Sequence, residues 1–277
     1  MPGESLGAAL AEAERLAGEG IGALLTCLGE SVTEKSEAGE VCAHYLGVIR
    51  EVAERRLDAQ VSLKLTHLGL DFDPAGTAER LLRIARAVRE RGSIVWIDME
   101  QSRCVEPTLD LFKKIRAECD NVGVCLQSYL RRTPSDVDSL GPGASHIRLV
   151  KGAYHEPRGA AHPRKRDVDE AYLKLARRLL LDPSRDGAIT GIATHDGRII
   201  AKIVALAREM KMPGRTFEFE MLYGINPQQQ RRLAREGHRV RVLISYGERW
   251  FAWYARRLAE RPANVLFVLR SLFGRQG

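Results

Sequence analysis

Short apolar stretches alternate with longer amphipathic stretches along the chain. Most of the apolar stretches are near-continuous in Val, Ile, Leu, Thr and Cys, which is typical of strands buried on both faces. Between them, apolar residues recur at spacings of three and four, as at 77–92 and 168–182, and this pattern predicts amphipathic helices. The eight predicted strands fall at 20–30, 59–70, 93–100, 122–130, 146–154, 187–196, 215–224 and 240–247.

Local signals predict where two of the helices begin. Thr108 precedes the sequence LDLFKKIRAECD, and Asn226 with Pro227 precedes QQQRRLAREG. Small polar residues and a first-turn proline are typical of helix N-termini, so we expect a helix to start at each point. The first 18 residues predict a further amphipathic helix ahead of the first strand.

Alternation of strand and helix with short connections predicts a parallel sheet. Eight such units in about 250 residues match the size of a TIM-type (βα)8 barrel. An open doubly wound sheet is the alternative, but no GxGxxG motif opens a helix. No internal linker stands out. We expect one α/β domain over 1–277, with an N-terminal helix at 1–18, the barrel at 20–260 and a C-terminal segment at 261–277.

The charge balance admits several classes of partner. The formal charge is +7 and the pI about 9.3, values compatible with nucleic acid, an anionic membrane or an anionic ligand. The basic residues are interleaved with acidic ones along helices, which is typical of solvated helix faces. Aromatic residues make up only 6%, which argues against a nucleic-acid platform. A non-enzymatic anionic-ligand binder stays open as an alternative function.

Sorting and redox signals favour the cytoplasm. No stretch approaches the roughly 18–20 apolar residues that cross a bilayer. The N-terminus lacks a basic region before an apolar block, so no secretory signal is expected. The five cysteines are scattered and form no CxxC pair, a pattern that suits a reducing compartment and predicts no zinc site.

Polar residues gather where the predicted strands end. Catalytic groups of such barrels lie at the C-terminal ends of the strands, so these residues predict one shared site. Any one of them alone could be a structural residue at the barrel mouth, with its polar atoms fully used in hydrogen bonds or a salt bridge. Six successive strands contribute them: Lys64, Thr66, His67, Asp98, Glu100, Gln127, Tyr129, Arg148, Lys151, Tyr154, Thr194, His195, Asp196, Glu220, Leu222 and Tyr223.

Lys64 leaves two kinds of chemistry open. A lysine at the end of a barrel strand can form a Schiff base, as in a lyase or aldolase, or it can bind an anion. A metal site built from His67, Asp98, Glu100 and His195 is a further alternative. No HxH or HExxH spacing supports it, so we expect no metal.

The segment GERWFAWYARRLAERPAN predicts a last helix over the barrel mouth. Arg256 and Arg257 point about 100° apart on a helix, so both can reach one concave site. Glu260 follows at spacings of four and three and can orient a guanidinium. Two planar guanidinium groups suit a carboxylate ligand. An ordinary exposed pair of arginines on an amphipathic helix is the alternative.

Taken together, these segments resemble the proline dehydrogenase family. The matching segments are KLTHLGL, IDME, LQSYLRRTPSDV, RLVKGAYHE, ATHD, EFEMLYG and YGERWFAWYARRLAERPAN, in that order from about residue 20 to 270. The resemblance implies a distorted (βα)8 barrel that binds FAD at the strand C-termini, with its last helix over the flavin.

The resemblance also implies a role for each matching residue. Arg148 would lie near the flavin N5 and Gln127 at the isoalloxazine edge. The remaining cofactor contacts would come from Lys151, Gly152, Ala153, Thr194, His195, Arg257 and Glu260. Lys64, Arg256 and Arg257 would bind the substrate carboxylate, and Leu222 would form an apolar wall. The residues expected to act in catalysis are Lys64, Asp98, Arg148 and Tyr154.

The implied reaction is hydride transfer from a small amino acid to the flavin. Fixing the carboxylate by three cations sets the α-carbon side of the substrate against the acceptor atom. The amine must lose a proton, to solvent or to Lys64. We expect a quinone as electron acceptor, with oxygen as the alternative, and both a monomer and a homo-oligomer stay open. The apolar end of the chain, NVLFVLRSLFGRQG, predicts either a peripheral membrane contact or the closure of the last helix layer.

Three positions depart from the family pattern. Leu243 and Trp253 stand where the family usually has tyrosines that border the substrate ring. Glu220 stands where a glutamine is common. Losing two hydroxyls changes the shape and polarity of the pocket, so we expect that the best substrate is an amino acid other than proline itself.

Overall fold

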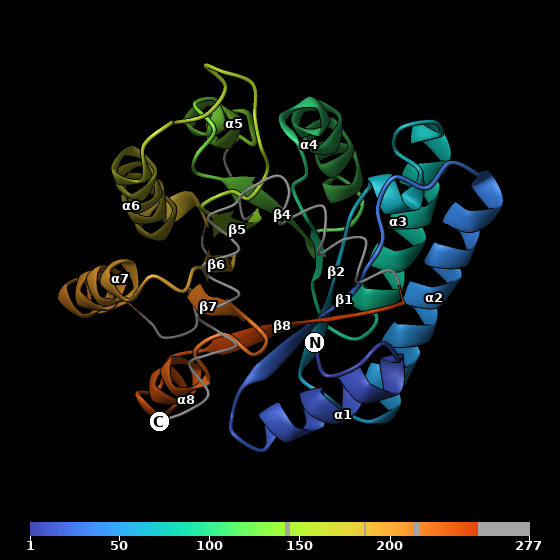
Figure 1. Cartoon of the computed structure of the whole chain (residues 1–277), viewed down its shortest axis with the longest axis horizontal. Helices are drawn as coiled ribbons and strands as arrows, with labels where there is room; N and C mark the ends of the chain where they lie inside the picture. Colours follow the sequence, from blue (N-terminus) through green and yellow to red (C-terminus); the bar gives the residue numbers. More distant parts are fainter. Residues whose placement is uncertain (142–144, 186, 213–216, 249–277) are drawn as a thin grey trace.

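The structure is a computed structural model of the chain and describes residues 1–141, 145–185, 187–212 and 217–248. Eight parallel strands pair in sequence order and close on themselves as a barrel (Figure 1). The strands are β1 (Gly22–Cys27), β2 (Ala59–Leu63), β3 (Val95–Ile97), β4 (Val122–Gln127), β5 (His146–Val150), β6 (Thr190–Ala193), β7 (Phe217–Leu222) and β8 (Val240–Tyr246). The predicted (βα)8 barrel is therefore confirmed.

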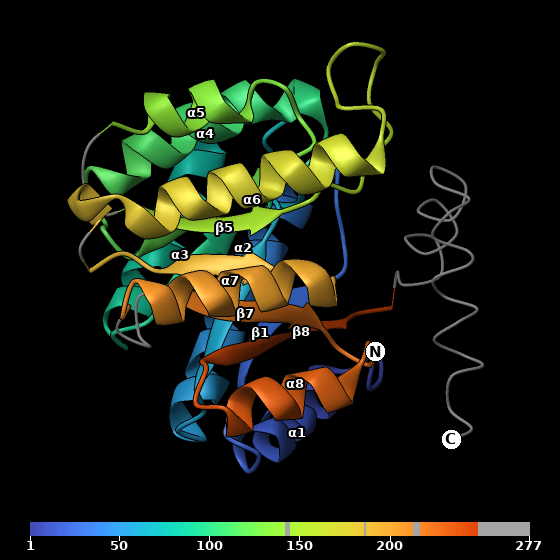
Figure 2. The same cartoon turned by 90° about the vertical axis from the view of Figure 1, so that its left-hand side faces the viewer.

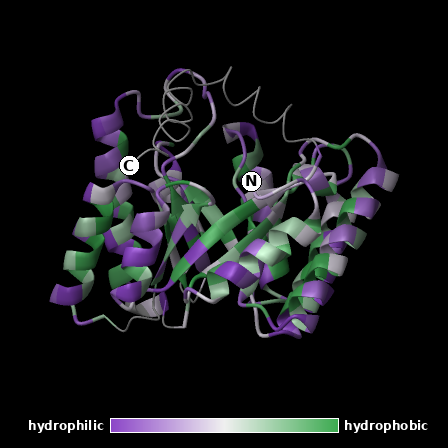
Figure 3. Ribbon diagram, turned by 60° about the horizontal axis from the view of Figure 1, so that its bottom comes forward, coloured by the Kyte–Doolittle hydropathy of each residue, from purple (hydrophilic) through white to green (hydrophobic). Residues whose placement is uncertain are grey.

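Helices surround the barrel on its outside (Figure 2). They are α1 (Leu6–Ala17), α2 (Lys35–Glu54), α3 (Pro74–Arg89), α4 (Ser102–Arg116), α5 (Thr133–Ser139), α6 (Lys165–Leu181), α7 (Gly197–Glu209) and α8 (Pro227–Arg235), with short 3-10 turns η1 (Thr66–Leu68) and η2 (Pro183–Arg185). Hydrophobic residues concentrate on the strands and on the helix faces that meet them (Figure 3). Among the described helices, none combines the length and the apolar character needed to span a bilayer.

Helix α1 covers the place where the barrel closes. It packs against β1 and β8, the two strands that join the ends of the sheet. Just after β8, the backbone N–H of Gly247 donates to the Glu4 carbonyl at 2.9 Å. In a regular repeat the helix after the eighth strand would take this position. Here the helix ahead of the first strand does so.

The barrel interior is lined by polar side chains as well as apolar ones. Near the strand starts, Arg241 pairs with Glu218 at 3.0 Å and with Asp58 at 2.8 Å. One layer higher, the indole N–H of Trp96 donates to the Gln60 side chain at 2.6 Å. Buried charges must be paired to be tolerated, so these contacts constrain which strands can lie opposite one another.

One predicted helix start is confirmed and the other is wrong. Asn226 caps α8, since its side chain accepts from the Gln229 N–H at 3.3 Å. Thr108, by contrast, lies inside α4, which begins at Ser102 and runs through Pro107. The turn ahead of the proline is helical because Cys104 and Val105 pack into the core. This burial outweighs the one backbone hydrogen bond that the proline removes.

We predict that Gly123→Ala lowers the free energy of unfolding by about 1–3 kcal/mol, measured by chemical denaturation. A Cβ at this position of β4 would lie 2.5 Å from the Trp96 ring, which is buried inside the barrel and cannot move aside. As control, Gly39→Ala should stabilise by ~0.5–1 kcal/mol, because a Cβ there meets nothing on the exposed face of α2. Equal effects of the two changes would contradict this account of the packing.

Candidate active site

A cavity of about 430 Å³ opens at the C-terminal ends of the strands. The predicted catalytic, substrate-binding and cofactor-binding residues in the described part of the chain line it: Lys64, Asp98, Gln127, Arg148, Lys151, Gly152, Ala153, Tyr154, Thr194, His195, Leu222 and Leu243. Glu220 lines it as well, but six other strand-end residues that were expected to share the site do not: Thr66, His67, Glu100, Tyr129, Asp196 and Tyr223. The other predicted site residues, Trp253, Arg256, Arg257 and Glu260, lie outside the described residues, as does the expected helix over the mouth.

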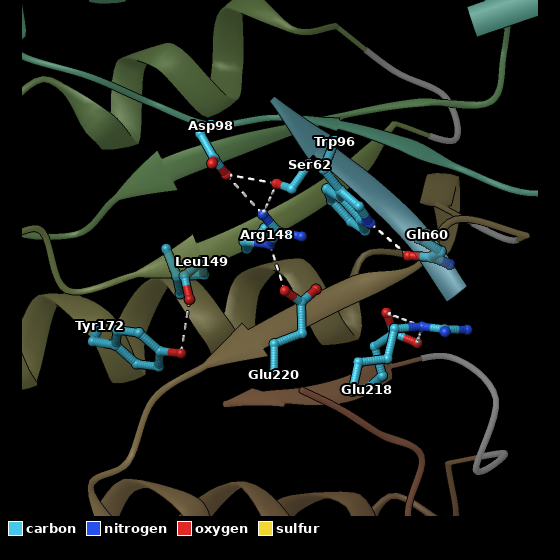
Figure 4. Close-up of polar contacts among 10 residues, drawn as sticks. Gln60, Ser62, Trp96, Asp98, Arg148, Leu149, Tyr172, Glu218 and Glu220 are labelled. Carbon is cyan, nitrogen blue, oxygen red and sulfur yellow. Dashed lines mark hydrogen bonds and ion pairs between the residues drawn. The ribbon is translucent and has the colours of Figure 1, made fainter. Parts of the chain in front are cut away.

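A buried guanidinium lies at the floor of this cavity. Arg148 on β5 forms ion pairs with Glu220 on β7 and, at 2.9 Å, with Asp98 at the end of β3 (Figure 4). The Ser62 hydroxyl on β2 contacts both Arg148 and Asp98: it accepts from the guanidinium at 2.7 Å and donates to the Asp98 carboxylate at 2.8 Å. The guanidinium carbon lies 4.6 Å from the centre of the Trp96 ring, which adds a cation–π contact.

The pKa values at this floor shift in directions that follow from burial and charge. Burial raises the pKa of the Glu220 carboxyl to about 7, although Arg148 acts in the opposite direction. Burial also lowers the pKa of Arg148, but Glu220 and Asp98 more than compensate, so the guanidinium stays charged. Burial raises the pKa of the Cys125 thiol to about 12, which makes this thiol a poor nucleophile.

Several buried polar atoms of the floor have no hydrogen-bond partner in the described part of the chain. They are Arg148 Nη2, Gln127 Oε1 and Glu220 Oε1. The Gln127 amide reaches the Met99 carbonyl only with its nitrogen, at 3.3 Å. A buried donor and buried acceptors in the lining of one cavity suit a planar ligand that carries both acceptors and donors, as a flavin ring system does. The residues present therefore fit the cofactor that the resemblance implies.

Lys64 lines the same cavity from the end of β2. The residue follows β2, is largely buried, and places its ammonium nitrogen 3.8 Å from Glu30. Nearby, Thr66 donates to Glu100 through its backbone at 3.1 Å and through its hydroxyl at 2.6 Å. Burial raises the pKa of Glu100 in spite of these bonds. No described group of three or more His, Cys, Asp or Glu residues could hold a metal ion.

The β6 side of the cavity combines a neutral histidine with a paired lysine. Burial lowers the pKa of His195 to about 4, and its Nε2 accepts from the Leu222 N–H at 3.0 Å, so the neutral ring carries its proton on Nδ1. The Lys151 ammonium contacts Asp169 at 2.5 Å and Asp196 at 2.8 Å. Burial would raise the pKa of Asp196, but Lys151 outweighs it and holds that pKa below its usual range.

The loop after β5 is fixed by an aromatic ring. Gly152 has a φ of +116°, and a Cβ there would lie 2.2 Å from the Tyr129 ring, so only glycine fits. The Tyr129 hydroxyl donates to Glu156 at 2.9 Å, and the same carboxylate accepts from the Ser102 N–H at 3.0 Å. The loop that carries Lys151 is thereby tied to the start of α4.

Three supporting residues were not selected from the sequence: Ser62, Trp96 and Cys125. The sequence contains a signal for them, since inward-facing side chains recur every second residue along a strand. Ser62 lies two residues before Lys64, and Trp96 two before Asp98. Glu220 was noted only as a strand-end residue and a departure, yet it forms part of the cavity floor.

We predict that Tyr129→Phe speeds tryptic cleavage at the exposed Arg158 by ~10-fold, because a hydrogen bond to a charged group is lost while the ring stays on Gly152. Mass spectrometry of the fragments gives the rate. Tyr172→Phe is the matched control: it removes a hydroxyl that donates to Leu149 at 2.9 Å, outside the loop. If both variants were cleaved at the same rate, Tyr129 would not tie the loop down.

Comparison with known proteins identifies the family. A family model described as proline dehydrogenase matches residues 9–270. Proline dehydrogenase 2 of Bacillus subtilis subsp. natto is 38% identical over 270 residues, which cover 98% of this chain and 88% of that protein. The proline dehydrogenase of Deinococcus radiodurans is 37% identical over 275 residues, covering 98% of this chain and 87% of that protein.

Solved structures agree in fold. Proline utilization A (PutA) from Bdellovibrio bacteriovorus superposes with a TM-score of 0.81 at 24% identity, covering 90% of this chain and 30% of that one. The PutA of Corynebacterium freiburgense gives 0.77 at 22% identity, covering 97% of this chain and 31% of that one. Since the family model and two close relatives span nearly the whole sequence, the chain belongs to the proline dehydrogenase family of oxidoreductases.

Proposed function

We propose that this protein oxidises L-proline, or a closely related cyclic or N-substituted amino acid, to the imine with FAD as hydride acceptor. The observation that carries the proposal is the cavity floor. A guanidinium paired with two carboxylates has one buried nitrogen without a partner among the described residues, and the same holds for the Gln127 oxygen in the lining of the same cavity. Relatives with the name proline dehydrogenase support the substrate class.

The cofactor would lie against residues from β4, β5 and β6. Arg148 offers Nη2 to it, and the Gln127 amide, whose two ends can exchange, offers a donor or an acceptor. The loop from Lys151 to Ala153 and the Thr194–His195 pair line the rest of that wall. FAD supplies the hydride acceptor, and the fixed positive charge of Arg148 stabilises the negative charge that the transfer delivers.

The substrate would lie on the β2 side, with its carboxylate near Lys64. Arg256 and Arg257 are the further cations we assign to this carboxylate. Leu222 and Leu243 give the cavity an apolar wall against which a small ring packs. Before transfer the amine gives up a proton to solvent, and Tyr154 with Asp98 provides the polar floor.

A Schiff-base lyase is less well supported. A Schiff-base lysine must attack as the neutral amine. Lys64 instead forms an ion pair with Glu30 at 3.8 Å, and the relatives that span nearly the whole chain are named proline dehydrogenases. Borohydride trapping with substrate would detect a covalent lysine adduct directly.

Transfer of the electrons to a quinone would complete the cycle. The same proposal includes a cytoplasmic location, with at most a peripheral membrane contact of 264–277. It also includes assembly of several copies of the chain. Activity with a soluble quinone, compared in the presence and absence of anionic vesicles, tests the acceptor and the membrane contact together.

The purified protein is expected to show the absorption bands of oxidised flavin, and added proline is expected to bleach them without oxygen. In Lys64→Met the flavin content should stay the same, while kcat/KM falls about 10- to 100-fold, mainly through KM, because a charged hydrogen bond to the carboxylate is lost.

Lys202→Met is the matched control, since this lysine is exposed on α7. It should leave both flavin content and KM unchanged. A colourless protein would contradict the proposed cofactor, and equal loss of flavin and substrate affinity in Lys64→Met would contradict the role of Lys64.

Leu243→Tyr is expected to lower kcat/KM for the six-membered pipecolate more than for proline. The larger side chain narrows the apolar wall on β8, and the larger ring fills more of the cavity. Steady-state rates with proline, hydroxyproline, pipecolate and an N-methylated amino acid measure the change. A wild-type protein that already prefers proline by a wide margin would contradict the idea that Leu243, in place of the family's tyrosine, changes the substrate preference.

A further inference from the structure

The cavity floor contains more negative than positive charge. Arg148 carries one positive charge and is paired with two carboxylates, Asp98 and Glu220. The two carboxylates differ in their access to water: the Asp98 side chain is 21% exposed and that of Glu220 only 3%. Solvent can therefore stabilise the charge of Asp98, while Glu220 depends on the guanidinium that it shares.

Among the described residues, Arg148 is the one cation that forms an ion pair with Glu220; Arg241 lowers the pKa of Glu220 only through its charge. Arg241 on β8 is already engaged by Glu218, which also lies 3.4 Å from Arg239. Glu218 lies two residues away on β7, and its negative charge disfavours a second one at Glu220. Two other titratable groups of the described residues lie near Glu220: the Cys125 thiol on β4 and the Tyr172 hydroxyl on α6. Burial raises the pKa of both, so both are neutral and add no charge.

The second oxygen of Glu220 accepts no hydrogen bond from any of the described residues. Its Oε1 lies against β6, where a Cβ on Gly191 would be 2.1 Å away, so the strand offers neither a side chain nor a charge there. The neighbouring inward residue, Ala193, is apolar. A carboxylate oxygen buried without a donor favours the protonated acid, because only the charged form needs the missing hydrogen bond.

We propose that Glu220 gains and loses a proton in the neutral pH range and so sets the net charge around Arg148. Glu220 is then the residue that controls the charge beside the arginine expected to bind the flavin. With Glu220 ionised, the three side chains sum to one negative charge; with Glu220 protonated, they are neutral. The inference rests on the proposed flavin site for its functional meaning.

The proton on Glu220 affects how readily electrons are accepted at the cavity. A negative charge beside Arg148 cancels part of its attraction for the charge that hydride transfer delivers. Protonation of Glu220 removes that opposition, so reduction favours uptake of one proton from solvent, which is returned on reoxidation. No bond to Glu220 other than its O–H bond is made or broken.

The first test is a carboxyl titration by NMR of the full-length protein labelled at the glutamate side-chain carbon. Wild type should show one glutamate that titrates in the neutral range, and E220Q should lack it. D98N should move that titration to lower pH, because Arg148 then serves a single carboxylate. A wild-type spectrum in which every glutamate is already ionised at pH 5.5 would overturn the proposal, as would D98N leaving the titration in place.

The second test is the pH dependence of the flavin reduction potential from pH 5.5 to 8.5. E220Q should match wild type at the acid end and be easier to reduce at the alkaline end. E218Q is the comparison variant, since Glu218 is a buried carboxylate on the same strand with its own arginine. Its curve should keep the pH-dependent step of wild type but show it at lower pH, because the charge of Glu218 disfavours ionisation of Glu220. Parallel curves for wild type and E220Q would overturn the role of Glu220. A protein without flavin would instead refute the proposed function, and the NMR titration would still decide whether Glu220 exchanges a proton.

Discussion

A guanidinium enclosed in a closed barrel must be matched by negative charge that is held in place, because an unpaired buried ion costs several kcal/mol. Arg148 meets this requirement through carboxylates from strands on either side of it. Asp98, Arg148 and Glu220 come from β3, β5 and β7, and alternate strands contribute to one layer of a barrel interior. The stagger of the whole sheet therefore determines whether this charge is balanced, and the cavity above it depends on that balance.

The fold could be predicted from the chain because its signals are local and repeated. Eight apolar runs separated by amphipathic stretches leave few arrangements, and parallel strands bring their C-terminal ends to one face. The same argument identified which strand-end residues share a cavity. A local signal also failed at Thr108, where buried residues ahead of Pro107 extended α4 by packing that no capping pattern expresses.

The pairing inside the barrel could not be predicted. Arg148 and Glu220 are 72 positions apart in sequence, and their strands are separated by β6. Whether their side chains meet depends on barrel shear, which a strand pattern does not encode. Trp96 and Ser62 were missed for a related reason: each belongs to an inward-facing series that is visible only once the parity of its strand is known.

Helix α1 has a consequence for how the protein is made. Its packing surface includes β8, and the first residues of the chain hydrogen-bond to the last turn of the described barrel. Helix α1 is thus synthesised more than two hundred residues ahead of a strand that it packs against. Contacts so distant in sequence form slowly, because loop closure must precede any gain from packing. Barrel closure is therefore a late event in folding, and until then the apolar edges of β1 and β8 are open to chaperones or to aggregation.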